Sequence, residues 1–122
     1  MKKDRNRNKV NIFNKNKRYK ILSIKEKKTK EEKFYESYMG YVLSAELNML
    51  QDGEYHLQLF RTGEDGAYPS EYGLLTSKIS NPECDIKFDT TNKLVYVETA
   101  NSIYVLKELD DEDIPRFWWN YN

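Results

Sequence analysis

The chain has 122 residues, and its twenty basic and twenty acidic side chains give a formal net charge of zero. This length is sufficient for one domain, and the single cysteine, Cys84, excludes an intramolecular disulfide and a cysteine-ligated zinc site within one chain. No apolar run has membrane-spanning length, and none of signal-peptide length follows the basic start, so we expect a cytoplasmic protein. We expect Cys84 to be a buried or half-buried structural thiol.

The two ends of the chain carry opposite charges. Residues 1–33 contain fourteen Lys and Arg against four Asp and Glu, a net charge of +10, and residues 34–122 contain six against sixteen, a net charge of −10. Such asymmetry is typical of a basic arm joined to a folded body. We therefore expect residues 1–28 to be a largely disordered basic arm, and residues 29–122 to be an acidic compact domain with an aromatic C-terminal tail.

The segment TKEEKFYESYMG has the signals of a short helix. Thr29 and Glu32 have the spacing of a capping box, and Gly40 stands where a left-handed residue ends a helix. Phe34 and Tyr38 would lie on one apolar face. A short helix between Thr29 and Gly40 is the prediction.

The next segment, YVLSAELNMLQDGEYHLQLFR, predicts a hairpin. A three-residue Gln51–Asp52–Gly53 loop, with Gly53 left-handed, pairs Met49 with Tyr55, Leu47 with Leu57 and Ala45 with Leu59. This register is favoured over a two-residue loop because it collects the polar residues of both strands on one face.

A second hairpin is predicted in KLVYVETANSIYVLKEL. A three-residue loop at 99–101 pairs Val97 with Ile103 and Val95 with Val105, which makes both faces apolar. We expect this hairpin at the centre of the fold, covered on each side. Two further strands are expected within residues 73–79 and 84–89, followed by a turn at 89–92. The predicted fold class is α+β, mainly antiparallel β, with one short helix and about six strands in an antiparallel sheet or small barrel.

Two patterns suggest chemistry, and both favour a structural role. His56 is the only histidine, and its neighbours resemble a solvated polar surface. Asp85 and Lys87, with Asp65 upstream, match part of a metal-dependent nuclease pattern, which leaves a nuclease as an alternative function. We expect a protein that is not an enzyme and has no cofactor and no metal.

Two segments have the composition of partner-binding sites. The loop at 62–73 combines tyrosines with acidic residues, and the C-terminus places two tryptophans after an acidic run; the alternatives are a surface loop and a tail packed on the core. The predicted partner-binding residues are Glu64, Asp65, Tyr68, Glu71, Tyr72, Trp118 and Trp119.

The basic arm has what a nucleic acid needs: cations for phosphates, amides for base edges and rings for stacking. One alternative is that the composition of the arm reflects codon bias. The other is that the arm pairs with acidic surfaces, in one chain or between copies; the protein would then be a protein–protein regulatory module or a homo-oligomer. The predicted nucleic-acid-binding residues are Lys2, Lys3, Arg5, Arg7, Lys9, Lys15, Lys17, Arg18, Tyr19 and Lys20.

In its layout of a basic arm before a small mixed domain rich in Lys, Asn and Tyr, the chain resembles accessory proteins of phages and mobile elements of low-GC Gram-positive bacteria. Some anti-CRISPR proteins are similar in this layout, although no motif is shared. The resemblance implies a non-catalytic binder of nucleic acid or of a nucleoprotein complex, such as an inhibitor of a CRISPR guide-RNA nuclease.

Overall fold

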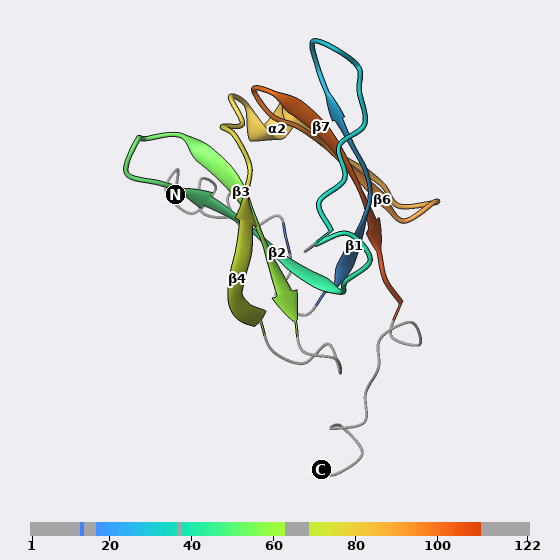
Figure 1. The fold of residues 1–122 in the computed structure, drawn as a ribbon. Coiled ribbons are helices and arrows are strands. Elements are labelled where there is room, and N and C mark those ends of the chain that lie inside the picture. Colours follow the sequence, from blue (N-terminus) through green and yellow to red (C-terminus); the bar gives the residue numbers. More distant parts are fainter. Residues whose placement is uncertain (1–12, 14–16, 37, 63–68, 111–122) are drawn as a thin grey trace.

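The fold is a single antiparallel sheet of seven strands. The structure, a computed structural model, describes residues 13, 17–36, 38–62 and 69–110. The strand order is β4-β3-β2-β1-β7-β6-β5, and one very short helix, α2, precedes β5 (Figure 1). The elements are β1 (Tyr19–Glu26), β2 (Leu43–Met49), β3 (Tyr55–Thr62), β4 (Pro69–Leu75), α2 (Pro82–Asp85), β5 (Ile86–Asp89), β6 (Leu94–Glu98) and β7 (Ser102–Glu108).

The sheet bends at the contact between β1 and β2. These two strands pair only at Tyr19 and Leu43, whereas β1 pairs with β7 along its whole length. In Figure 1 the half with β2, β3 and β4 lies opposite the half with β1, β7 and β6. Side chains from both halves form one core, where each fully buried Leu, Ile or Val contributes roughly 1.5–3 kcal/mol; the most deeply buried are Ile24, Leu43, Leu57, Leu59, Ile79, Leu106, Val95 and Val97.

Strand β1 corrects the expected extent of the arm. Tyr19–Glu26 falls inside the region predicted to be disordered, yet it is the middle strand of the sheet. Its inward side chains are Tyr19, Ile21 and Ile24, and a bulge between Ile21 and Ser23 changes their spacing from two residues to three. Because of this bulge, apolar and polar residues do not alternate strictly along β1, and the sequence pattern did not predict a strand. Residues 1–12 and 14–16 lie outside the described residues.

The helix predicted between Thr29 and Gly40 is wrong. The chain turns after β1, with Lys30 at φ 64°, and Glu32 then forms a bridge with Lys25. Thr29 Oγ1 accepts the Glu31 N–H in a local turn, and does not begin a helix. Gly40 is left-handed as predicted, at φ 93°, but it follows a single turn closed by the bond from the Met39 N–H to the Tyr35 carbonyl.

The β2–β3 hairpin confirms its predicted register. Met49 pairs with Tyr55, Leu47 with Leu57 and Ala45 with Leu59. Gly53 has φ 78°, and its N–H donates to the Leu50 carbonyl, so the loop has three residues as predicted. The sequence therefore carries enough information to place this hairpin.

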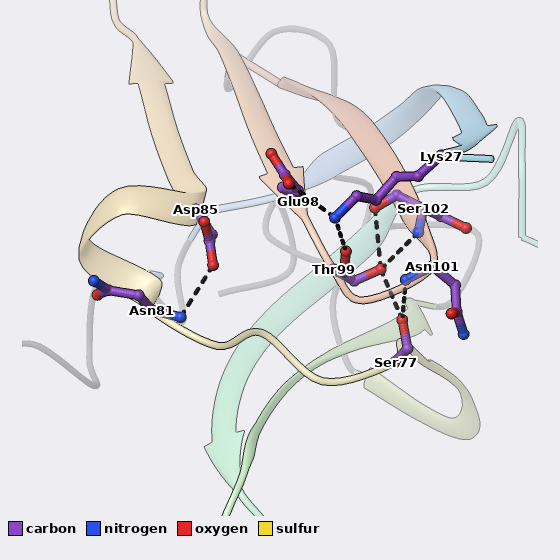
Figure 2. A network of polar contacts seen from close by, with 8 residues as sticks. All are labelled: Lys27, Ser77, Asn81, Asp85, Glu98, Thr99, Asn101 and Ser102. Atoms are coloured by element: carbon purple, nitrogen blue, oxygen red, sulfur yellow. Dashed lines mark hydrogen bonds and ion pairs between the residues drawn. The ribbon is translucent and has the colours of Figure 1, made fainter. Parts of the chain in front are cut away.

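The β6–β7 hairpin differs from its prediction by one residue. Val97 pairs with Tyr104 and Val95 with Leu106, around a two-residue loop. Thr99 closes this loop because its Oγ1 accepts the Ser102 N–H and contacts the Ser102 carbonyl oxygen (Figure 2). The hairpin has one buried face and one solvent face, so the prediction of a hairpin covered on each side is also wrong.

The remaining elements are shorter or longer than expected. Strand β4 begins at Pro69, so the connection from β3 is shorter than the predicted 62–73 loop, and residues 63–68 lie outside the described part of the chain. Asn81 caps α2 by accepting the Glu83 N–H. The turn at 89–92 is confirmed by the bond from the Asn92 N–H to Asp89 Oδ1. No helix in the described ranges is long and apolar enough to cross a membrane.

Candidate nucleic-acid interface

The solvent-facing side of β1, β7, β6 and β5, here called the outer face, is a continuous four-stranded surface. Directly paired residues in an antiparallel sheet point to the same side, so the register determines which side chains share it. Ser23, Val105, Tyr96 and Lys87 form one row across the four strands. The neighbouring rows add Lys20, Lys107, Leu94 and Asp89 on one side, and Lys25, Ile103 and Glu98 on the other.

Lysines outnumber acidic groups on the outer face. Lys20, Lys25, Lys87 and Lys107 all lie on it, and Lys20 pairs directly with Lys107, although like charges on paired residues destabilise a sheet. Near the middle is Tyr96, 38% exposed. An aromatic ring framed by lysines is the combination that favours contact with a nucleic acid.

The two acidic groups of the outer face are already engaged. Lys27 Nζ lies 2.9 Å from Glu98 Oε2 and donates to the Thr99 carbonyl oxygen at 3.2 Å (Figure 2). The hydrogen bond from Lys27, followed by its charge, holds the pKa of Glu98 below its usual value. Asp89 accepts both the backbone N–H and the side-chain amide of Asn92, which lowers its pKa. The hydrogen bonds of both carboxylates thus go to Lys27 and Asn92, and among the four lysines only Lys87 adds a charge effect on Glu98.

Basic residues continue around one end of the outer face. The turn after β1 and the β6–β7 turn meet where the Lys27 N–H donates to the Asn101 carbonyl oxygen. Between them is an open hollow of about 300 Å³, in which Lys33 pairs with Glu26 at 3.2 Å. The hollow is lined by Glu26, Lys27, Lys28, Lys33, Ala100 and Asn101.

The opposite half of the sheet has a different surface. On the solvent side of β2 and β3, Glu46 pairs with Gln58 and Asn48 with His56, and the Asn48 amide donates to the Gln58 side chain. Among the described side chains of that surface there is no lysine. Arg61 is the basic residue of these two strands, and its guanidinium lies over the ring of Tyr41. The outer face therefore carries more lysines than this surface does, although residues 34–122 are acidic as a whole.

Four of the ten predicted nucleic-acid-binding residues fall in the described part of the chain. Lys20 lies on the outer face, whereas Lys17 pairs with Glu108 at 3.2 Å and Arg18 is half-buried, with Nη1 donating to the Lys17 carbonyl oxygen. Tyr19 is only 3% exposed and packs edge-on against Phe13, so its ring is not available to a base. Burial, and then the charge of Glu108, raises the pKa of Tyr19 to about 12. Lys2, Lys3, Arg5, Arg7, Lys9 and Lys15 lie outside the described residues.

The predicted partner-binding residues are not brought together by any described contact. Glu71 and Tyr72 belong to β4, at one edge of the sheet. The other five, Glu64, Asp65, Tyr68, Trp118 and Trp119, lie outside the described residues.

His56 is a buried side chain that joins two segments, and not the surface residue that its neighbours suggested. Nδ1 lies 2.9 Å from the Thr76 carbonyl oxygen and Nε2 lies 2.8 Å from Asp52 Oδ2. Both partners can only accept, so the ring donates from both nitrogens when it is protonated. The bond to Thr76 raises the pKa of His56 above its usual value, against burial, and the contact with Asp52 acts in the same direction.

Two residues of the alternative nuclease pattern, Asp85 and Lys87, lie on neighbouring elements, and Asp65 lies outside the described residues. Asp85 ends α2, where its Oδ2 accepts the Asn81 N–H, and Lys87 points to solvent from β5. Cys84 is exposed on α2, which corrects the expectation of a buried thiol, and the Asn81 amide lies 3.4 Å from its sulfur. Within residues 17–36, 38–62 and 69–110, no three His, Cys, Asp or Glu side chains gather to hold a metal ion.

No protein-family model, no curated protein and no solved structure matches this chain. The function is therefore inferred from surface chemistry. Sequence reasoning missed Lys25, Lys87, Lys107 and Tyr96 as site residues. They come from four different strands, and only the register of β1, β7, β6 and β5 brings them onto one surface.

Proposed function

We propose that the protein is a non-catalytic nucleic-acid-binding protein that uses the outer face. The observation that carries the proposal is the set of four outward lysines around Tyr96, brought onto one surface by the register of four strands. Lysines release counterions from a phosphate backbone when they bind it, and this gives affinity without sequence preference. The basic residues before β1 would extend the same contact.

The distribution of ion pairs favours nucleic-acid binding over an alternative in which the lysines only balance the negative charge of the same chain. If the lysines served only to offset the acidic body, they would be expected beside acidic partners. Lys17, Lys27 and Lys33 do have such partners. The two carboxylates nearest to Lys87 and Lys107 are instead hydrogen-bonded by other lysines: Glu98 by Lys27 and Asp110 by Lys93. Lys87 and Lys107 act on these carboxylates only through their charge, so their ammonium groups can also bind an external phosphate.

Replacing Lys87 and Lys107 by Gln tests the proposal. If each lysine contacts one phosphate, the pair contributes about 1.4 to the slope of log affinity against log salt for a single strand, and its loss should weaken binding about 25-fold at ~0.1 M salt. The measurement is a salt titration of binding to a fluorescent oligonucleotide, followed by anisotropy.

The matched control is the double variant Lys30→Gln and Lys78→Gln. It removes the same charge at two exposed lysines outside the outer face, so it should change the slope by less than half as much. Equal losses in the two double variants would mean that net charge alone governs binding, and the outer face would then have no special role.

Interference with a guide-RNA nuclease, which the resemblance implies, remains a proposal about the partner. An outer face that binds phosphates could engage the RNA of such a complex. Pull-down of a purified guide-RNA nuclease by wild-type protein, but not by the Lys87→Gln and Lys107→Gln variant, is the expected result. Capture of the enzyme without its guide RNA would contradict an RNA-mediated contact.

A further inference from the structure

The outer face also indicates which form of nucleic acid it takes, an inference that rests on the proposed function. We propose that it binds a single strand, with one base stacked on the ring of Tyr96. The geometry of the four strands, the exposure of Tyr96 and the placement of the lysines each support a single strand over a duplex.

The shape of the outer face does not fit a duplex groove. Four strands spaced about 4.8 Å apart place the axes of β1 and β5 roughly 14 Å from one another before side chains are added. A major groove about 12 Å wide accepts one helix or a two-stranded ribbon, and the minor groove is narrower. A duplex could therefore touch this face only through its phosphates, and its bases would not reach Tyr96.

The ring of Tyr96 is positioned as a stacking surface. It projects from β6 between Val105 on β7 and Lys87 on β5, and 38% of the residue is exposed. Val105 is its directly paired neighbour on the same face and has an apolar side chain. Stacking on an aromatic ring is open to any base that is not already paired, which is the state of bases in a single strand.

The lysines lie where the backbone of a stacked nucleotide would pass. Lys87 pairs directly with Tyr96, and Lys107 is its diagonal neighbour through Val105, at about 7–8 Å between Cα atoms. A base on Tyr96 thus has a cation on each side of it for its flanking phosphates. Lys25 and the hollow with Lys28 continue the positive charge in the direction of the β6–β7 turn.

The test compares probes and variants in one assay. The probes are an oligouridine and an oligothymidine of about 12 nucleotides and a duplex of the same length. We expect the wild type to bind the single strands at least about 10-fold more tightly than the duplex at equal salt. Tyr96→Leu should lose about 10-fold for single strands and little for the duplex, while Tyr96→Phe and Tyr96→Trp should retain affinity because they keep a ring.

Tyr41→Leu is the matched control. Tyr41 is also an exposed tyrosine, 41% accessible, but it lies under the Arg61 guanidinium, away from the outer face. Its replacement should leave both affinities unchanged. A preference for oligouridine over oligothymidine would add a contact with the 2′-hydroxyl, and equal affinity would assign binding to base and phosphate alone.

The outcomes separate this inference from the proposed function. If the Lys87→Gln and Lys107→Gln variant loses affinity while Tyr96→Leu binds single strands as well as the wild type does, the face binds nucleic acid and the stacking model is wrong. Tighter binding to duplex than to single strand also overturns it. Loss of affinity in neither variant would overturn both proposals.

Discussion

Replacing Ile24 by Ala should lower the free energy of unfolding by about 2–5 kcal/mol, the usual cost of emptying a buried Ile site. Ile24 has no exposed surface and lies in the middle strand of the sheet, opposite Tyr104 of β7. The loss includes the transfer of the removed methyl groups to water and the cavity that remains. Urea unfolding followed by circular dichroism measures it.

Leu22→Ala is the control within the same strand. Leu22 occupies the bulge of β1 and is 51% exposed, so its replacement should cost well under half as much. If the two variants were equally stable, residues 19–26 would not be a core strand, and the boundary of the basic arm would return to residue 28.

The second expected result is a pH dependence of stability that comes from His56. Its pKa is raised above the ordinary value of 6.5 in the folded protein, mainly by the bond to the Thr76 carbonyl. A group with a raised folded pKa stabilises the fold fully below its unfolded pKa. We therefore expect stability to fall as the pH rises above about 6.5 and through the folded pKa of His56.

Asp52 makes stability depend on pH in the opposite direction from His56, and at lower pH. Its pKa is lowered by the bond from the Glu54 N–H, and then by His56, so its contribution is present above its ordinary value of 3.8 and is lost as the pH falls through the lower folded value. Measurements of unfolding from pH 5 to 9 therefore separate the contribution of His56 from that of Asp52. The difference between wild type and His56→Gln should shrink as the pH rises, and a difference that is constant over this range would show that the ring is not a cation in the fold.

The sequence was informative where side-chain alternation and turn chemistry agree. In the β2–β3 hairpin, Gly53 fixes the left-handed position of the loop, and the apolar residues Ala45 and Leu47 then face Leu59 and Leu57. Only one register puts all of them on the core side, so it could be predicted from local pattern alone.

The same reasoning failed at two places. In one, a side-chain hydroxyl group closes a hairpin loop; in the other, a bulge interrupts the two-residue alternation of a strand. Thr99 closes the β6–β7 loop with its hydroxyl group, and Ser77 Oγ donates to it at 2.8 Å, a contact from a distant segment that the hairpin sequence does not contain. In β1 the bulge at Leu22 hides the strand. The first error involves a contact from outside the hairpin, and the second comes from a bulge that breaks the two-residue period of the strand.

The sequence suggested a lysine-rich site, but it did not indicate which strands would form that site. Charge asymmetry directed the prediction to the lysines of residues 1–33, and one of them, Lys20, lies on the outer face. Lys87, Lys107 and Tyr96 come from a region that is acidic overall, and nothing local distinguishes them from other solvent-facing strand residues. Their significance depends on the strand order β1-β7-β6-β5, which brings residue 20 beside residue 107.

The most direct test of the proposed interface is a chemical-shift map of the folded protein titrated with oligouridine of about 12 nucleotides. The account predicts that the largest changes in amide shift fall on Lys20, Lys25, Lys87, Tyr96 and Lys107, with little change at Glu46, Asn48 and Gln58 on the opposite half of the sheet. Shifts confined to the β2–β3 surface, or no saturable shifts at low salt, would contradict it.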